Sequence, residues 1–263
     1  MNAVRPLAVV TGASSGIGLA LAGEFARHGF DLVVCAEDAG LAAVADELRG
    51  LGADVTAVRA DLATYDGVEQ LYAAVLTKRR PVAAAALNAG VGKGGAFTDV
   101  GLADHARIID LNISSTVHLA HRLLPGMVAE GDGRLLITSS VASMAPGTFQ
   151  SVYSASKSFL QSFAQALREE LRGTGVTVTS LMPGATQTAF FRRAGMAGTR
   201  LGRMVKDDPA EVAGDAFEAL MRGRGRVVAG SVRSKALGAA VKVLPDRLKA
   251  VGQRYLSQPR PGR

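Results

Sequence analysis

Short apolar segments alternate with longer amphipathic ones along most of the chain, and this alternation limits the possible folds more than any other feature. The apolar runs are rich in Val, Ile, Leu and Ala, which is typical of strands covered on both faces. Strands separated by helices of this length form βαβ units around a parallel sheet. We therefore expect a single α/β domain, doubly wound, with a central parallel sheet of about seven strands flanked by helices.

The two kinds of segment define the elements that we expect. Strands are predicted over residues 7–11, 31–35, 54–59, 82–88, 134–138, 176–182 and 226–229. Helices are predicted over residues 16–28, 39–50, 65–77, 102–129, 152–172 and 209–222. No linker, fixed-period repeat or low-complexity tract divides the chain, so one domain is the simplest interpretation.

Two segments do not follow the alternation. Residues 189–206 contain three glycines and four arginines and are expected to form a mobile loop or lid. The residues after Gly230 are basic, weakly amphipathic and interrupted by Pro245. We therefore expect a main domain over residues 1–230 and a basic C-terminal extension over residues 231–263.

Charge is distributed unevenly along the 263 residues, whose formal net charge is +7. Residues 222–263 contain eleven Lys or Arg and one acid, a balance of +10, whereas residues 1–221 have a balance of −3. A basic end of this kind is typical of attachment to an anionic membrane or nucleic acid, or of assembly. We expect it to bear on attachment or assembly and hardly on the chemistry, with peripheral membrane contact favoured over nucleic acid.

Other features of the composition exclude several classes of protein. One cysteine cannot form an intrachain disulfide, so a disulfide scaffold is excluded and a reducing compartment, the cytoplasm, is expected. No apolar run reaches the roughly 18 residues that cross a bilayer, and residues 7–10 are too short for a signal peptide. The four histidines show no ligand spacing with carboxylates or Cys35, so we expect no metal.

A glycine-rich turn joins the first expected strand to the first expected helix and reads TGASSGIG over residues 11–18. Gly12, Gly16 and Gly18 permit a tight turn, close approach of a pyrophosphate and tight packing of helix on strand. The helix N-terminus supplies free N–H groups and a positive dipole end. The turn therefore predicts a dinucleotide site, although glycines here can also serve steric needs alone.

A tyrosine, a lysine and a serine form the candidate chemical group. Tyr153 and Lys157 are four residues apart, so on a helix they share one face. A lysine ammonium stabilises a phenolate and is expected to lower the pKa of Tyr153 toward that of a general acid or base. Ser140 ends a neighbouring strand and can hydrogen-bond a substrate oxygen. The alternative is a tyrosine ring at the edge of the core beside a snorkelling amine.

Six motifs occur in order along the chain, at the ends of expected strands or on the expected helices between them. They are Gly-x-x-x-Gly-x-Gly at residues 12–18, Asn88-Ala89-Gly90, Asn112, Ser140 thirteen residues before Tyr153, Tyr153-x-x-x-Lys157, and Pro183-Gly184 with Thr188. With these motifs the chain resembles the short-chain dehydrogenase/reductase family from about residue 5 to residue 230. The resemblance implies a Rossmann-like domain and an NAD(P)-dependent oxidoreductase. Such an enzyme transfers a hydride between nicotinamide and an alcohol or carbonyl substrate.

The resemblance also implies roles for individual residues. It makes Asn112, Ser140, Tyr153 and Lys157 the catalytic group, with Tyr153 as general acid/base. Asn112 is implied to anchor a water that connects Lys157 to solvent, and Lys157 to bind the nicotinamide ribose. Residues 189–206 are implied to cover the substrate.

Cofactor contacts follow from the same resemblance. Asp61 and Leu62 are implied to contact adenine, and Thr186 and Thr188 the carboxamide and pyrophosphate, unless these threonines merely cap the next helix. The full predicted set is Gly12, Ser14, Ser15, Gly16, Ile17, Gly18, Glu37, Asp61, Leu62, Asn88, Ala89, Gly90, Tyr153, Lys157, Pro183, Gly184, Thr186 and Thr188.

The end of the second strand bears on the choice between NAD and NADP, and it reads Ala36-Glu37-Asp38. An acid there accepts ribose hydroxyls and repels a 2′-phosphate, whereas an arginine attracts that phosphate. NAD-preferring relatives place Asp at position 36 and NADP-preferring relatives place Arg at position 37, and this chain follows neither. With two acids and no local cation, we favour NAD over NADP. The alternative is that Glu37 and Asp38 merely begin the next helix.

Two other classes of function stay open at this point. A non-catalytic dinucleotide sensor needs the glycine turn but has little use for the tyrosine, lysine and serine together. A membrane-surface or nucleic-acid-associated protein acting through its basic end accounts for the charge alone. Relatives commonly pair their long helices, so a homodimer or homotetramer is expected by analogy.

Overall fold

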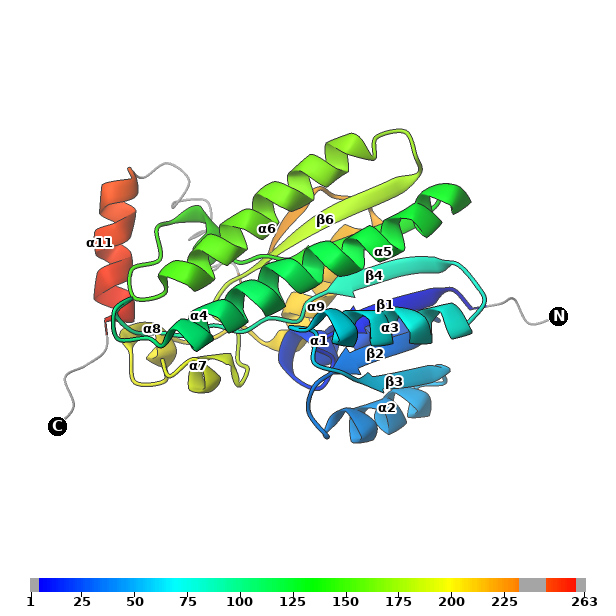
Figure 1. The fold of residues 1–263 in the computed structure, drawn as a ribbon, viewed down its shortest axis with the longest axis horizontal. Coiled ribbons are helices and arrows are strands. Elements are labelled where there is room, and N and C mark those ends of the chain that lie inside the picture. The colour runs from blue at the N-terminus through cyan, green and yellow to red at the C-terminus, as the bar shows by residue number, and fades with distance from the viewer. Residues whose placement is uncertain (1–4, 232–244, 259–263) are drawn as a thin grey trace.

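A computed structural model of the chain describes residues 5–231 and 245–258. Seven parallel strands form one sheet in the order β3-β2-β1-β4-β5-β6-β7, which confirms the predicted fold class (Figure 1). The strands are β1 (Leu7–Thr11), β2 (Asp31–Ala36), β3 (Val55–Arg59), β4 (Val82–Leu87), β5 (Gly133–Thr138), β6 (Val176–Pro183) and β7 (Arg226–Ala229). Their boundaries lie within one residue of the predicted ones.

Helices cover both faces of this sheet. One face packs on α1 (Gly16–Arg27), α2 (Leu41–Gly50) and α9 (Pro209–Met221). The other packs on α3 (Tyr65–Thr77), α5 (Ser115–Glu130) and α6 (Ser151–Glu170). Each layer buries its own cluster of aliphatic side chains, and β1, β2 and nearly all of β6 are buried along their length. The near-continuous apolar strands of the sequence follow from this two-sided cover.

Two predicted segments differ in detail from the structure. The helix expected over residues 102–129 is interrupted: α4 (Leu102–Ile108) and α5 are separated by a π-helical turn, η1 (Ile109–Ser114). The loop expected over residues 189–206 contains two short helices, α7 (Phe190–Arg193) and α8 (Arg200–Arg203). A further short helix, η2 (Val141–Met144), precedes α6, and α11 (Asp246–Ser257) closes the described chain. Of the predicted extension over residues 231–263, residues 232–244 and 259–263 lie outside the described part.

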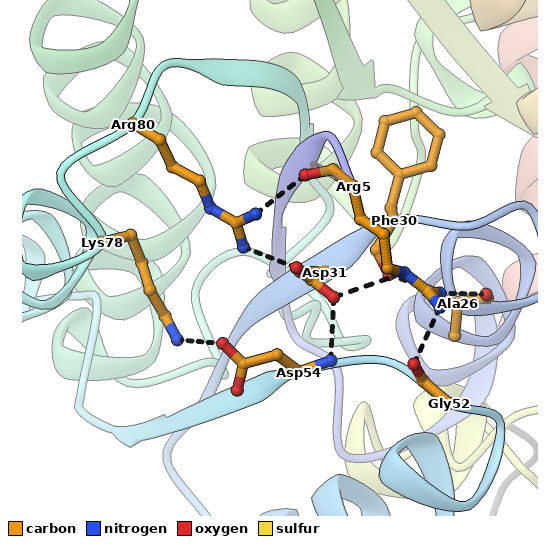
Figure 2. A network of polar contacts seen from close by, with 8 residues as sticks. All are labelled: Arg5, Ala26, Phe30, Asp31, Gly52, Asp54, Lys78 and Arg80. Carbon is orange, nitrogen blue, oxygen red and sulfur yellow. Dashed lines mark hydrogen bonds and ion pairs between the residues drawn. The ribbon is translucent and has the colours of Figure 1, made fainter. Parts of the chain in front are cut away.

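A polar network joins the amino ends of the central strands (Figure 2). Asp31 at the start of β2 pairs with Arg80 at 2.8 Å and Arg5 at 3.4 Å, and it accepts the Asp54 N–H at 2.9 Å. Burial alone raises the pKa of Asp31, but these three partners together hold it below its ordinary value. The arginines also bind backbone carbonyls, including that of Gly52. Ion pairs and hydrogen bonds therefore join the strands at their amino ends. A cavity lies at the opposite, carboxyl edge of the sheet.

Within residues 5–231 and 245–258 no helix has the length and apolar character needed to span a membrane. The same part of the chain holds no group of three or more His, Cys, Asp or Glu side chains arranged to bind a metal ion.

Candidate active site

A cavity of about 600 Å³ lies at the carboxyl ends of the strands, as expected for an open parallel sheet. Seventeen of the predicted cofactor residues line it, together with Ser140; the two predicted site residues that do not are Gly18 and Asn112. The cavity also has lining residues from the loop after β4, from α4, α7 and α8, and from α11.

The glycine turn is shaped by close packing. Gly12 and Gly16 have φ of +67° and +59°, a region that favours glycine. A Cβ on Gly18 would lie 2.0 Å from the Gly12 carbonyl oxygen, and one on Gly16 would lie 2.7 Å from Thr188. Ser15 is the N-cap of α1 and makes no side-chain cap hydrogen bond. The N–H groups of the first helical turn are therefore available at the cavity.

The segment after β4 is fastened to the turn and to the π-helical break. Thr11 Oγ1 accepts the N–H groups of Asn88 and Ala89 at 2.9 and 3.0 Å. Asn112 in η1 is fully buried, accepts the Val91 N–H at 2.8 Å and donates to the Val91 carbonyl and Ser156 Oγ, both at 2.9 Å. The side chain of Asn112 thus supports the cavity floor from behind. Short π-helical breaks of this kind often occur at functional sites.

Ser140, Tyr153 and Lys157 meet at the cavity. Ser140 lies two residues after β5 and is the N-cap of η2, where its Oγ accepts the Ala142 N–H at 3.1 Å. Tyr153 and Lys157 lie in the first two turns of α6, with the lysine Nζ 5.9 Å from the centre of the tyrosine ring. Lys157 Nζ donates to the Thr138 carbonyl at 2.8 Å. The predicted common face of the helix is confirmed.

The electrostatics of this group differ from the expectation. Burial raises the pKa of Tyr153 to about 12, against the opposing effect of its hydrogen bond with Ser140. Burial lowers the pKa of Lys157 to about 8. The prediction that Lys157 brings the pKa of Tyr153 down is wrong for this structure, because desolvation of the phenol is the largest effect on that pKa and outweighs the hydrogen bond with Ser140. Near neutral pH the phenol therefore keeps its proton.

The segment after β6 closes over this group. Phe190 of α7 packs on Tyr153 with ring centres 5.1 Å apart. A Cβ on Gly92 would meet Phe190 at 2.6 Å, so glycine is needed for this contact. Thr188 Oγ1 accepts the Phe190 N–H at 3.2 Å, which is the capping role left open by the sequence. Thr186 Oγ1 donates to the Gly184 carbonyl at 3.2 Å.

Comparison with known proteins places this geometry in a family. A family model described as short chain dehydrogenase matches residues 6–197. A 1-deoxy-11-beta-hydroxypentalenate dehydrogenase from Streptomyces exfoliatus is 36% identical over 218 residues, covering 81% of this chain and 78% of that protein. The chain belongs to the short chain dehydrogenase family.

Solved structures of other short chain dehydrogenases are similar to this one. That from Sphingobium yanoikuyae, in complex with NADPH, has a TM-score of 0.76 and 32% identity, with 89% of this chain and 93% of that chain covered. That from Burkholderia phymatum, in complex with NAD, has a TM-score of 0.79 and 25% identity, with 98% of both chains covered. This short chain dehydrogenase is an NAD(P)-dependent oxidoreductase, and neither a non-catalytic sensor nor a protein acting only through its basic end is favoured.

A cation that the sequence pattern did not predict lies near the end of β2. Arg107 of α4 pairs with Asp61 and with Glu37, both at 2.5 Å, and it lines the cavity. Its guanidinium holds the pKa of Asp61 below the ordinary value. Asp38 is bound by Ser14 at 2.5 Å. The premise that this region of the dehydrogenase has no local cation is therefore wrong, and only the position of α4 across the sheet reveals it.

A second arginine of the dehydrogenase, also not predicted from the sequence, contacts the glycine turn. Arg193 of α7 donates from Nη2 to Ser15 Oγ at 2.9 Å and lines the cavity. The segment 189–206 thus meets the turn that begins α1. A run of arginines is the signal that was present in the sequence, but its partner is 178 residues away.

Proposed function

We propose that this short chain dehydrogenase interconverts an alcohol and a carbonyl compound, with Tyr153 as the general acid/base. The observation that carries the proposal is that Ser140, Tyr153 and Lys157 line the same cavity as the glycine turn. A bound nicotinamide cofactor supplies or accepts the hydride. The protein then has to orient the substrate, exclude water and move one proton.

Reduction of a carbonyl is the direction that the tyrosine supports near neutral pH. Tyr153, with a pKa of about 12, is protonated and can give its proton to the substrate oxygen. Ser140, which already hydrogen-bonds Tyr153, can hold that oxygen in line. The buried ammonium of Lys157 stabilises the phenolate left behind. Phe190 packs against the ring of Tyr153 and covers part of it.

The glycine turn fits a dinucleotide. A Cβ on Gly12 would lie 3.1 Å from Ala89 Cα, so a side chain there would narrow the space between the turn and the segment after β4. The N–H groups of α1 and the guanidinium of Arg193 would hold a pyrophosphate, because both carry positive charge to the same place. The remaining predicted contacts, among them Lys157 to the ribose and a water anchored at Asn112, stay part of this proposal.

We propose NAD as the preferred cofactor, with NADP also accepted. Glu37 and Asp38 repel a 2′-phosphate, which favours NAD. Arg107 offsets the charge of Glu37 and Asp61, so the repulsion is weaker than two uncompensated acids would produce. Relatives with a similar fold are solved with either cofactor, one with NADPH and one with NAD.

The remaining proposals concern assembly, compartment and domain organisation. Assembly into a homodimer or homotetramer is supported by apolar side chains exposed on the helices that precede and follow β5: Leu102, Ile109 and Phe159. We retain the cytoplasm as the compartment, residues 1–230 as the main domain, and membrane contact through the basic end as the alternative use of residues 231–263.

The test is a panel of ketones, aldehydes and secondary alcohols, each assayed with NADH, NADPH or the oxidised forms. We expect carbonyl reduction at pH 7 with at least one class of ketone, and a kcat/KM that is higher with NADH than with NADPH. Cofactor binding without turnover of any carbonyl or alcohol contradicts the proposed reaction and supports a sensor. A higher kcat/KM with NADPH contradicts the proposed preference only.

A further inference from the structure

Helix α11 lies outside the residues matched by the family model, yet it forms one side of the cavity. Figure 1 shows it standing across the end of the molecule, beside α8 and the start of α6. The cavity-lining residues of the helix are Leu248, Lys249, Gly252, Gln253 and Leu256. Their spacing places them on one face. The described helix of the basic end therefore borders the cavity.

The loop between η2 and α6 holds α11 on one side of the cavity. Gln150 Nε2 donates to Ser257 Oγ at 2.9 Å, and both side chains are buried. Thr148 Oγ1 donates to the Ala250 carbonyl at 3.0 Å. These contacts join α11 to the segment that immediately precedes α6. Gln150 is the N-cap of α6, three residues before Tyr153.

The other attachment comes from the segment that covers Tyr153. Arg200 of α8 lies over the ring of Tyr255, with its guanidinium carbon 3.7 Å from the ring centre. Its Nη1 also donates to the Tyr255 carbonyl at 3.1 Å. Arg200 of α8 thus contacts both the side chain and the backbone of Tyr255 in α11. The helix is tied to both walls of the cavity and spans the space between them.

The side chains that face each other across this space are mainly apolar. Leu248 and Leu256 of α11 line it together with Ala142, Ala145, Phe190 and Leu201 of the other walls. Gln253 of α11 also lines the cavity, but its amide already donates to Ser257 Oγ at 3.0 Å. Lys249 pairs with Asp246 of its own helix at 3.1 Å. The space thus suits carbon-rich groups better than charged ones.

We propose that α11 is the outer wall of the substrate site and selects substrates with a bulky apolar group beside the reacting carbon. This inference rests on the proposed alcohol–carbonyl reaction. It assigns to Leu248 and Leu256 a role in specificity, through contact with the part of the substrate that does not react. A small ketone leaves this wall untouched, whereas a large one is held by it.

The test compares Leu256→Ala with Val251→Ala in the full chain. Val251 is on the same helix but does not line the cavity, so its substitution is the matched control. For an aryl alkyl ketone we expect kcat/KM of Leu256→Ala to fall about tenfold, from the loss of apolar contact. For acetone and for the cofactor, changes below twofold are expected. Equal effects of Leu256→Ala on the large and the small ketone, or equal effects of the two variants, would overturn the proposal.

A measurement without turnover separates this inference from the proposed function. Trypsin can cut α11 after Arg247, Lys249 and Arg254, and mass spectrometry reports the rate of cleavage. With NAD⁺ or NADP⁺ present, the aryl alkyl ketone should slow this cleavage at least threefold and acetone should not. If the large ketone slows cleavage but the chain reduces no ketone, the contact of the substrate with α11 is supported and the proposed alcohol–carbonyl reaction is contradicted. If the chain reduces ketones but the large ketone does not slow cleavage, the proposed role of α11 is contradicted and the proposed reaction is not.

Discussion

Arg107 forms an ion pair with Asp61, its Nη1 lying 2.5 Å from the carboxylate Oδ2. Asp61 follows β3 in the chain, whereas Arg107 belongs to α4, which comes after β4. The second nitrogen of the same guanidinium reaches Glu37 at 2.5 Å. One cation therefore pairs with two of the acidic side chains that line this end of the cavity.

Removal of this cation should sharpen the preference for NAD. In Arg107→Gln, Glu37 and Asp61 lose their counter-charge, and a 2′-phosphate is repelled more strongly than a 2′-hydroxyl. We expect KM for NADPH to rise about tenfold, which corresponds to about 1.4 kcal/mol, and KM for NADH to rise about threefold or less. Steady-state kinetics with both cofactors measures this. Arg122→Gln, at a pair with Glu69 that is remote from the cavity, is the control. An equal rise for both cofactors contradicts the prediction.

Loss of the tyrosine hydroxyl should abolish proton transfer and leave cofactor binding intact. For Tyr153→Phe we expect kcat to fall by about 10²- to 10⁴-fold, as for other general acids, with KM for the cofactor changed less than twofold. Tyr72→Phe is the matched control, since Tyr72 does not line the cavity. Activity of Tyr153→Phe near that of the wild type would show that another group moves the proton.

The buried lysine should leave a mark on the pH dependence of stability. The pKa of Lys157 is about 8 in the folded chain and 10.5 in its ordinary state. Between these values the unfolded chain binds more protons, so the free energy of unfolding gains from this group as pH rises. The cost of the buried charge is full below pH 8 and absent above about pH 10.5.

The variant Lys157→Met removes that cost. Urea unfolding at pH 7.5, 9 and 10 should show the variant gaining most over the wild type at pH 7.5, and progressively less toward pH 10. Tyr153 and Cys35 also have raised pKa values, of about 12, but the difference between variant and wild type cancels their contribution. A difference that does not change with pH argues against a desolvated ammonium at position 157.

Two glycines should respond to alanine in opposite directions. Gly18→Ala places a Cβ against the Gly12 carbonyl, so the turn must move. We expect a loss of about 1–3 kcal/mol in the free energy of unfolding, together with weaker cofactor binding. In α5, a Cβ on Gly126 meets nothing within 4 Å, and Gly126→Ala should stabilise by about 0.5–1 kcal/mol. Urea unfolding compares them; a neutral Gly18→Ala contradicts the packing argument.

The sequence by itself determined the sheet and the neighbourhood of the site. Alternation of apolar and amphipathic runs follows from burial on both sheet faces, and it placed every strand within one residue. Carboxyl ends of parallel strands share one edge, so motifs at those ends, such as the glycine turn and Ser140, had to meet. The common face of Tyr153 and Lys157 is likewise a local property of a helix.

Only the tertiary structure decided contacts made by long side chains and by the chain end. Arg107 reaches Glu37 from 70 residues away, and Gln150 reaches Ser257 from 107 residues away. Such contacts depend on how helices cross the sheet, which periodicity does not encode. The pKa of Tyr153 was decided there too, because desolvation by the surrounding walls, and not the spacing to Lys157, sets its direction.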